Sequence, residues 1–196
     1  MLKELFDRLN AIRPLSDELK EALIRELEVI DVPKRTILLH EGERCDYVYV
    51  VLSGLMRMYY HKDGEEICSR FMDKDHICIS VYSFFTRGAG YEYIETIENC
   101  TLARIRHDQL QRLYNEIVEF NYFTRVITEM YFVRSEERLF LLRKQTVEER
   151  YTYFSNTYPE LLQRVPLKYI ATYLGTSIET LSRIRGKISR GKRAGK

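Results

Sequence analysis

The stretch VPLKYIATYLGTSIETLSRIRGK, from Val165 to Lys187, shows the clearest pattern in the chain. Its first half places apolar residues three and four positions apart, at Leu167, Ile170, Ala171 and Leu174. That spacing predicts one apolar face of a short helix. Gly175 follows directly, and a glycine at this place lets the backbone turn sharply after the helix.

A second short helix is predicted after this turn. Ser177 can cap it, and Glu179 places a negative charge in its first turn, where the helix dipole favours one. Three apolar residues are expected to face inward: Leu181, Ile184 and Ile188. The opposite side carries polar and basic residues. Two short helices joined by a glycine turn, the second with a basic free face, are typical of a helix-turn-helix.

A helix-turn-helix binds DNA when its second helix enters the major groove. Glu179 could accept a hydrogen bond from a cytosine amino group, and Arg183 could pair with guanine or with a phosphate. The predicted contacts to double-stranded DNA are Thr176, Ser177, Glu179, Thr180, Arg183, Lys187 and Arg190. An ordinary helical hairpin with a solvated charged face would show the same pattern, so the segment alone leaves both interpretations open.

Upstream of this segment, the chain from Val29 to about Arg106 reads as a series of short strands. The strand-like segments are ILLHEG, DYVYVVLSG, LMRMYYH, EEICSRFM, YEYIETIE and CTLARIR. Asp63-Gly64 lies between two of them and predicts a hairpin with a type I′ turn, which needs positive φ at both positions. Many short strands at close spacing predict a barrel, a roll or a sandwich.

Helical patterns flank the strands on both sides, over residues 1–30 and after His107. The first part of the long helical region carries an apolar seam at Phe123, Val126, Met130 and Val133. Because Glu136 and Glu137 interrupt the seam, its paired part is expected between about Val118 and Arg134. Such a seam packs against the chain's own strands or against a second subunit, and a homodimer is the favoured prediction. A shorter helix is expected from Thr146 to Tyr158.

Composition fits a globular protein, with 45% hydrophobic and 31% charged residues. No apolar run reaches the roughly 18 residues that span a bilayer. The N-terminal sequence MLKELFDRLN lacks the apolar stretch of a signal peptide, so we expect no membrane partner and a cytoplasmic location. Four cysteines lie far apart, at Cys45, Cys68, Cys78 and Cys100. Free buried thiols are expected there, with no metal and no iron–sulfur cofactor.

The order of parts resembles the Crp/Fnr family of regulators: a cyclic-nucleotide-binding-type β-roll, a long dimer helix and a DNA-binding hairpin. Two motifs carry the resemblance. LLHEGERCDYVYVVLSGLMRMYY, from Leu38 to Tyr60, has glycines and a tyrosine where the family's roll has them, at Gly42, Tyr49 and Gly54. LGTSIETLSRIR, from Leu174 to Arg185, is similar to the family's G-x-S-R-E-T-x-x-R signature.

The resemblance implies an α+β fold, with an N-terminal antiparallel β-roll of double-stranded β-helix (jelly-roll) type and flanking helices. The implied division is a sensor domain at 1–117, a dimerisation helix at 118–144 and a DNA-binding domain at 145–196. The chain departs from the family in two respects. Ile178 stands where the signature has its first arginine, and the tail ISRGKRAGK is too short and polar for the usual β-hairpin wing. The basic residues 191–196 are expected to act as a phosphate-binding arm in its place.

Cyclic-nucleotide-binding members of the family use a glutamate on the ribose and an arginine on the phosphate. In the corresponding stretch, Asp75 to Ile97, the glutamate position falls near Ile79 or Ser80 and the arginine position near Gly90 or Tyr91. Arg87 is a weak substitute. Burying a phosphate without a cationic partner is costly, so cyclic AMP is not expected to bind in the family's usual way.

This stretch is instead rich in aromatic residues. A possible pocket for an unidentified small-molecule effector consists of Tyr82, Phe84, Arg87, Tyr91 and Tyr93. The same residues could equally serve as core and dimer contacts. His61 and His76 are isolated, so no haem or metal ligation is predicted for them.

Three classes of function follow. The favoured one is a homodimeric DNA-binding regulator. The second is a ligand-sensing or interaction protein whose DNA-binding domain has degenerated, which Ile178 and the missing wing favour. An enzyme is not expected, because the sequence shows no nucleophile–base pairing, no glycine-rich phosphate loop and no metal constellation.

Overall fold

The structure is a computed structural model that describes the chain from residue 2 to residue 194, and its side chains from residue 2 to residue 188. The chain divides into two compact units. The roll unit comprises residues up to 60 together with residues 70–130, and the helical unit comprises residues 61–69 together with the residues from 131 onward.

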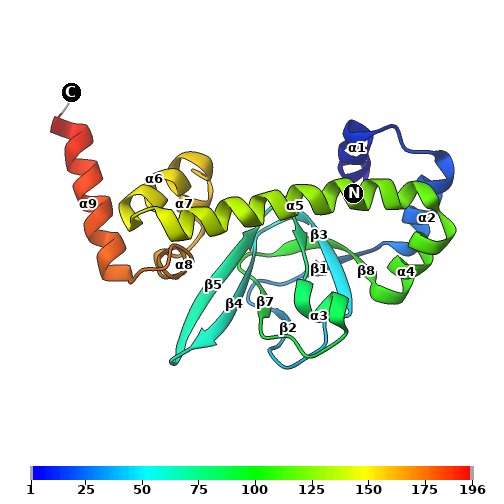
Figure 1. Cartoon of the computed structure of the whole chain (residues 1–196), viewed down its shortest axis with the longest axis horizontal. Helices are drawn as coiled ribbons and strands as arrows, with labels where there is room; N and C mark the ends of the chain where they lie inside the picture. Colours follow the sequence, from blue (N-terminus) through cyan, green and yellow to red (C-terminus); the bar gives the residue numbers. More distant parts are fainter. Residues whose placement is uncertain (1, 195–196) are drawn as a thin grey trace. The chain divides into compact units, whose positions relative to one another are not determined.

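Strands form two four-stranded antiparallel sheets (Figure 1). The first sheet has the order β1-β8-β3-β6, with β1 (Glu28–Val32), β8 (Cys100–Arg106), β3 (Tyr47–Ser53) and β6 (Ile77–Cys78). The second has the order β2-β7-β4-β5, with β2 (Ile37–Leu39), β7 (Tyr93–Thr96), β4 (Met56–Lys62) and β5 (Glu65–Met72). Together with the flanking helices, these sheets confirm the predicted α+β fold with an N-terminal β-roll.

The helices of the roll unit are α1 (Lys3–Ile12), α2 (Asp17–Glu26), α3 (Val81–Thr86) and α4 (His107–Glu116), followed by the start of α5 (Val118–Lys144). Apolar side chains of α2 and α4 share one buried cluster with residues of both sheets, among them Leu19, Leu113, Leu102 and Ile94. These contacts explain why the helices flank the sheets rather than form a separate domain.

Two details of the roll unit differ from the sequence-based prediction. The N-terminal helical pattern was predicted to reach residue 30, but α2 ends at Glu26 and residues 28–32 pair with β8 as strand β1. The segment EVIDV has three β-branched residues, Val29, Ile30 and Val32, which suit a strand better than a helix turn. The aromatic stretch after β6 contains helix α3, which the pattern of strands did not reveal.

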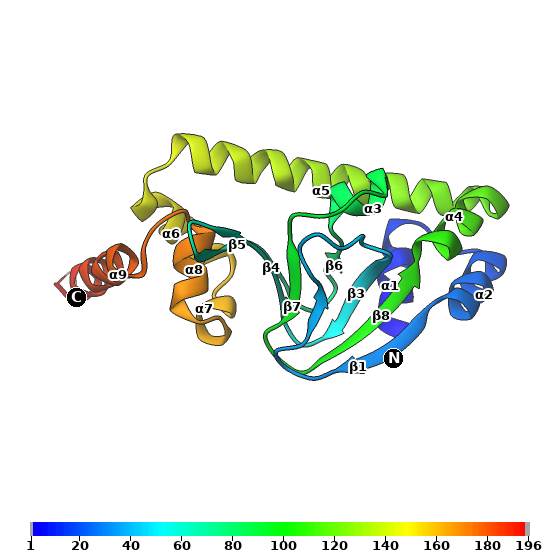
Figure 2. The same cartoon turned by 90° about the horizontal axis from the view of Figure 1, so that it is seen from below.

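The helical unit contains the second half of α5 and then α6 (Val147–Thr157), α7 (Leu161–Arg164), α8 (Leu167–Tyr173) and α9 (Ile178–Ala194), of which α6, α7 and α8 gather together (Figure 2). Helix α6 begins with a capping box, because Thr146 and Glu149 bond to each other's backbone N–H groups. This confirms the predicted helix from about residue 146 to 158.

The hairpin tip between β4 and β5 also belongs to the helical unit. Asp63 and Gly64 have φ values of 53° and 82°, so both positions are left-handed, as the predicted type I′ turn requires. Further along this hairpin, the backbone N–H of Cys68 donates to Thr172 Oγ1 at 3.1 Å. The hairpin is therefore tied directly to helix α8.

Helix α5 leaves several large apolar side chains exposed. Phe123, the first residue of the predicted seam, is buried in the core of the roll unit, which is one of the two alternatives that the sequence left open for the seam. Met130 and Val133 are exposed as expected, but exposed apolar residues continue past the two glutamates to Leu139, Phe140 and Leu142. Exposed apolar side chains thus also occur beyond Arg134, the predicted limit of the paired part of the seam, and that limit stays a prediction.

Candidate nucleic-acid interface and effector cassette

The turn between α8 and α9 is fixed by backbone geometry and by one arginine. Gly175 has a φ of +69°, the left-handed conformation that ends many helices. The N–H of Thr176 donates to Ala171 O at 3.0 Å and that of Gly175 to Thr172 O at 3.0 Å. Arg150 Nε donates to Leu174 O at 2.9 Å, so a side chain of α6 satisfies the last carbonyl of this turn.

Burial orients the two helices. On α8 the predicted apolar face is buried, with Ile170, Ala171 and Leu174 hardly exposed. On α9, Leu181 is fully buried, while Ile184 and Ile188 are half-buried. The inward face predicted from the sequence is thus the one that packs, which leaves the opposite face of α9 outside.

Most of the residues predicted to contact DNA lie on or beside this outer face. Ser177, Glu179, Arg183 and Lys187 are exposed, and Thr176 and Thr180 are half-exposed. The side chain of Arg190 lies outside the described residues, as does the side-chain part of the proposed basic arm at 191–196. Over the described part of this region, the backbone of α9 stays helical to Ala194, so no wing strand occurs there.

Polar contacts at the start of α9 are local. Ser177 Oγ accepts from the N–H of Thr180 at 3.3 Å, which confirms Ser177 as the N-cap. Arg183 Nη2 donates to Thr180 Oγ1 at 3.2 Å. Hydrogen bonds from its own backbone N–H and from Ser177 hold the pKa of Glu179 below its ordinary value. At neutral pH Glu179 therefore presents a carboxylate that can only accept hydrogen bonds.

One predicted contact already has a partner within the chain. Lys187 Nζ lies 2.8 Å from Glu148 Oε2 and 3.1 Å from Glu148 Oε1. Sequence reasoning missed Glu148, because the pairing joins α9 to α6 across 39 residues. To contact DNA, the Lys187 ammonium would have to leave the Glu148 carboxylate for a phosphate or contact both groups at once.

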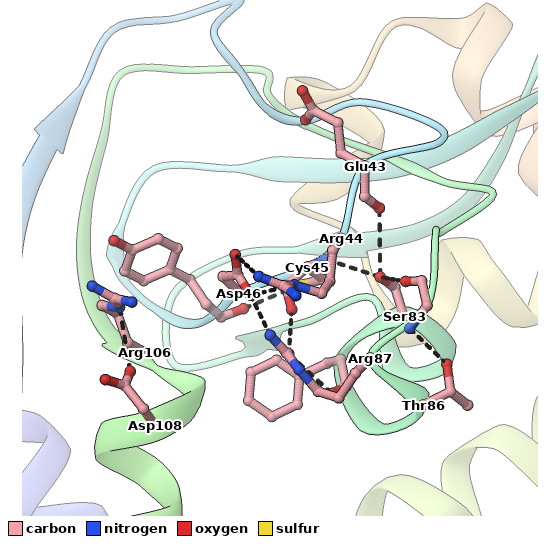
Figure 3. Close-up of polar contacts among 12 residues, drawn as sticks. Glu43, Arg44, Cys45, Asp46, Ser83, Thr86, Arg87, Arg106 and Asp108 are labelled. Atoms are coloured by element: carbon pink, nitrogen blue, oxygen red, sulfur yellow. Dashed lines mark hydrogen bonds and ion pairs between the residues drawn. The ribbon is translucent and has the colours of Figure 1, made fainter.

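The segment around α3, from Asp75 to Ile97, is called the cassette below. A polar network holds it in place (Figure 3). Arg87 ends α3 in a left-handed conformation, with a φ of 60°. Its guanidinium donates to Cys45 O at 2.9 Å and Phe84 O at 3.2 Å and forms an ion pair with Asp46. Arg44 Nε also reaches Asp46, at 3.0 Å. The only cation predicted for an effector is thus bound to the loop that precedes β3.

Ser83 ties the same loop to α3 from the other side. Its hydroxyl accepts from the buried N–H of Cys45 at 2.8 Å and donates to Gly88 O at 2.6 Å. Figure 3 shows Ser83 and Arg87 directed from α3 toward this loop. Neither Asp46 nor Ser83 stood out in the sequence, because their roles depend on contacts about 40 residues apart.

The positions where the family binds cyclic nucleotides are occupied by contacts of the chain with itself. The N–H of Gly90 donates to Glu43 O at 2.9 Å, and Gly90 O accepts from the N–H of Gly42 at 2.8 Å. Ser80 is buried, and its hydroxyl lies 3.2 Å from Glu92 Oε2. A carboxylate at this place opposes an anionic ligand, which supports the expectation that cyclic AMP does not bind in the usual way.

The five residues predicted for an effector pocket do not come together. Phe84 is fully buried in the core, and Arg87 belongs to the network just described. Tyr82 and Tyr91 are half-exposed and pair with ring centroids 5.6 Å apart. Tyr93 stacks instead on Tyr59 of β4, at 4.9 Å. Core packing therefore accounts for Phe84, while a ligand role for the other four stays a prediction.

A cavity of about 390 Å³ lies beside the same loop. Its walls come from β2, the loop and β3, and are formed by Leu38, Leu39, Glu43, Arg44, Cys45, Asp46, Tyr47 and Tyr49. The volume is within the range of small-molecule sites. No sequence pattern predicted this cavity, although its lining residues lie close together in the sequence, because a cavity depends on how those residues fold.

Titration of the groups at the cassette follows from burial and charge. Burial raises the pKa of the Cys45 thiol. Cys68, Cys78 and Cys100 are, like Cys45, buried thiols outside any disulfide, as predicted. Burial and the nearby Arg87 lower the pKa of His107. Burial also opposes ionisation of Asp46, but hydrogen bonds from Arg44 and Arg87 outweigh it and hold the pKa of Asp46 below its ordinary value.

Comparison with known proteins identifies the architecture. Residues 29–116 match the family model of the cyclic nucleotide-binding domain. FixK2 from Bradyrhizobium japonicum superposes with a TM-score of 0.69 at 19% identity, over 85% of this chain and 86% of that one. The c-di-GMP responsive regulator CLP from Xanthomonas campestris superposes with a TM-score of 0.71 at 18% identity, over 90% of this chain and 93% of that one. A transcriptional regulator from Eubacterium rectale that is assigned to the Crp/Fnr family superposes with a TM-score of 0.71 at 19% identity, over 90% of this chain and 85% of that one.

This chain has the Crp/Fnr fold. The resemblance inferred from the two sequence motifs is thereby confirmed, from the roll to the helix-turn-helix. A search of curated protein sequences found no match. Two of the three named proteins, those from Xanthomonas campestris and Eubacterium rectale, are described as regulators. Within the described residues, no helix is both long and apolar enough to cross a membrane.

Proposed function

We propose that the chain is a homodimeric transcription regulator that binds double-stranded DNA through helix α9 and works in the cytoplasm. One observation carries the proposal. The first turns of α9 expose Glu179 and Arg183 on one side, and the N-cap Ser177 is exposed at the start of the helix, while Leu181 anchors the other side in the helical unit. A helix held in this way can enter a major groove without unfolding any part of its own domain.

The residues on this face divide by chemistry. Glu179 and Arg183 can read base edges, since a carboxylate accepts from cytosine and a guanidinium donates two hydrogen bonds to guanine. Thr176, Ser177, Thr180, Lys187 and Arg190 suit phosphates, which set affinity and register but carry no sequence information. The basic residues at 191–196 form an additional phosphate-binding arm in this proposal.

Dimerisation is assigned to α5. Val126, Val133 and Phe140 follow one another at intervals of seven residues, which is the repeat of a coiled-coil seam. Met130 and Phe140 are about half-exposed, so the seam is available to a second copy. The sensor domain at 1–117, the dimer helix at 118–144 and the DNA-binding domain at 145–196 are the functional division that this proposal uses.

The effector, where one acts, is a small molecule other than cyclic AMP. The closed arrangement at Gly90 and the carboxylate of Glu92 argue against a cyclic phosphate in the usual place. The cavity beside the loop at residues 43–46 and the exposed pair Tyr82 and Tyr91 are the two places where a less charged molecule could bind.

The test is selection of bound DNA from a random duplex library, using the full chain, followed by measurement of the affinity for the selected sites. Selected sites should be two-fold symmetric, with half-site centres about 34 Å, or one helical turn, apart. Sedimentation should show a dimer, and Val133→Asp should shift it toward monomer. A library that yields no enriched sequence would favour the alternative, a sensor or interaction protein with a degenerate DNA-binding domain.

A further inference from the structure

The cavity lined by β2, the loop and β3 lies wholly within the roll unit, and one part of its wall is apolar. This part combines Leu38 and Leu39 of β2 with Tyr47 and Tyr49 of β3. The two tyrosine rings have their centroids 6.0 Å apart. The Arg104 guanidinium lies over the Tyr47 ring, 4.7 Å from its centroid, and helps to hold that ring in place. A ligand would therefore meet an apolar surface that is already formed.

The loop adds a negative charge to the wall through Glu43. Glu43 Oε2 accepts from the backbone N–H of His40 at 2.9 Å. Within the described part of the chain, this carboxylate forms no ion pair. Its negative charge is therefore not balanced by a neighbouring cation.

Positive charge is in excess around Asp46, which also lines the cavity. Arg44 and Arg87 both pair with this carboxylate, so two guanidinium groups share a single negative charge. Arg87 also donates to two carbonyl groups, whereas Nη1 of Arg44 has no hydrogen-bond partner among the described residues. Figure 3 shows the side chains of Glu43 and Arg44 leaving the loop in different directions. The wall thus carries a negative group at one place and an available guanidinium at another.

These two charges restrict the chemistry of a ligand. A purely apolar molecule would remove Glu43 and Arg44 from water and offer neither of them a partner, which is costly. An anion would be repelled by Glu43, and a cation would be repelled by the excess guanidinium charge. A molecule that has both an ammonium and a carboxylate group avoids both penalties, and its remaining part must be apolar to match the leucines and tyrosines.

We propose that this cavity binds a free amino acid with a large apolar side chain. The carboxylate of the ligand pairs with Arg44, its ammonium group pairs with Glu43, and its side chain packs against the apolar wall. The inference deepens the effector part of the proposed function and rests on it for the role of the ligand, whereas the binding itself needs no DNA.

The size and the position of the cavity agree with such a ligand. A volume of about 390 Å³ is near the low end of the range for small-molecule sites, which suits an amino acid better than a nucleotide. The lining residues lie at positions 38–49, whereas the positions where family members bind cyclic nucleotides fall near residues 79–80 and 90–91. The proposed site is therefore separate from the family's nucleotide site.

The test uses L-tryptophan as the probe. The chain contains no tryptophan, so indole fluorescence from a mixture with the full chain comes from the ligand alone. The emission should move to shorter wavelength and saturate as protein is added, because the indole leaves water for an apolar wall. L-phenylalanine and L-leucine should displace the probe. D-tryptophan should bind more weakly, since three separate contacts fix the hand of the ligand.

Two analogues of the probe test the charged contacts one at a time. Tryptamine lacks the carboxylate, and indole-3-propionate lacks the ammonium group. Each should bind roughly tenfold more weakly than L-tryptophan, the effect of losing one hydrogen bond between charged groups. Calorimetry of the same three compounds gives an independent measure of the affinities.

Variants connect each group of the ligand to a residue. Arg44→Gln should weaken binding of L-tryptophan roughly tenfold and leave binding of tryptamine unchanged, because tryptamine has no carboxylate to lose its partner. Glu43→Gln should act in the same way on L-tryptophan and leave indole-3-propionate unchanged, and it keeps an oxygen for the N–H of His40. The matched controls Glu41→Gln and Arg25→Gln change exposed residues outside the cavity and should leave all affinities unchanged. Circular dichroism establishes that each variant folds as the wild type does.

The outcomes separate this inference from the proposed function. Absence of saturable binding of L-tryptophan, L-phenylalanine and L-leucine overturns the amino-acid site and leaves the regulator proposal standing. Equal affinities for L-tryptophan and its two analogues overturn the site as well, as does binding that neither Arg44→Gln nor Glu43→Gln weakens. Failure to select any DNA sequence overturns the regulator proposal but not the amino-acid site. The comparison of the three compounds needs only wild-type protein, so it decides even where a variant fails to fold.

Discussion

The α3 cassette and helix α9 use similar polar residues for opposite purposes. In the cassette, Arg87 is bound to Asp46 and to two carbonyl groups, and Ser83 bonds to the loop that faces it. On α9, the exposed side chain of Arg183 donates a hydrogen bond to Thr180 of its own helix. One region is closed on itself and the other is open to a partner.

This difference indicates which of the two regions has polar groups available to a partner. A guanidinium that already donates to buried carbonyl groups cannot turn to a ligand without leaving them unsatisfied, which costs free energy. A guanidinium supported only by a neighbouring hydroxyl loses little when it binds a base. The same substitution should therefore weaken DNA binding in one region and destabilise the fold in the other.

The largest effect is expected on α9. Arg183→Ala should weaken binding to the selected DNA roughly 10- to 100-fold, because a bidentate contact to guanine contributes about 1–3 kcal/mol. Its melting temperature should stay close to that of the wild type, since the side chain is exposed and packs against little. Fluorescence anisotropy measures the affinity, and Arg25→Ala on α2 is a control that removes another exposed arginine. Unchanged affinity would remove Arg183 from the interface.

Gly90→Arg tests whether the cassette is closed. It restores the family's arginine at a buried position where a Cβ would lie 3.2 Å from Ser83 Cβ, tighter than an ordinary contact. We expect a loss of about 1–3 kcal/mol in the free energy of unfolding, because neighbouring atoms must shift. Calorimetry should show no binding of cyclic AMP to the wild type or to the variant.

Gly88→Arg is the matched control for this change. A Cβ at residue 88 meets only Thr86 Oγ1, at the ordinary distance of 3.5 Å. This variant should cost clearly less stability than Gly90→Arg. Tight binding of cyclic AMP by the Gly90→Arg protein would contradict the closed arrangement and show that only the arginine was missing.

The sequence predicted the open region better than the closed one, for a physical reason. Every signal for the α8–α9 hairpin is local: the apolar spacing, the left-handed glycine and the serine cap act within a few residues. The pairs that matter elsewhere, Arg87 with Asp46 and Lys187 with Glu148, join residues 41 and 39 positions apart. No spacing rule connects such pairs, because only the folded chain brings them together.

The same reason explains the errors in secondary structure. Helix α3 is six residues long and rich in aromatic residues, so its composition favours a strand and its contacts with the loop at residues 43–46 decide otherwise. In the predicted seam on α5, Met130 and Val133 are exposed, whereas Phe123 belongs to the core, because burial of a single helix position depends on what folds against it.

A smaller effect on DNA binding is expected at Lys187, the residue of α9 that is paired with a carboxylate of α6. Lys187 is paired with Glu148, and both side chains are well exposed, so the ion pair itself is weak. Glu148→Gln should strengthen DNA binding about twofold to threefold, because it releases Lys187 and removes a negative charge from the edge of the interface. The slope of affinity against salt concentration should steepen by about one phosphate contact.

Glu4→Gln on α1 is the control for this change, since Glu4 also pairs with a lysine on an exposed surface, Lys74. It should leave both the affinity and its salt dependence unchanged. Weaker DNA binding by Glu148→Gln would mean that the carboxylate holds Lys187 in its binding position rather than competing for it.

The smallest effect is a pH dependence that belongs to the closed region alone. Because Arg44 and Arg87 hold the pKa of Asp46 below its ordinary value of 3.8, the folded state favours the carboxylate more than the unfolded state does. The stability that this adds is fully present above pH 3.8 and is lost as the pH falls through the lower pKa of the folded protein. The melting temperature of the wild type should therefore exceed that of Asp46→Asn at higher pH, and the gap should shrink on acidification. Arg87→Ala should reduce this difference in melting temperature, whereas Arg183→Ala should leave it unchanged. If Arg87→Ala does not change the difference, Arg87 does not stabilise the Asp46 carboxylate, and the contrast between the two regions is lost.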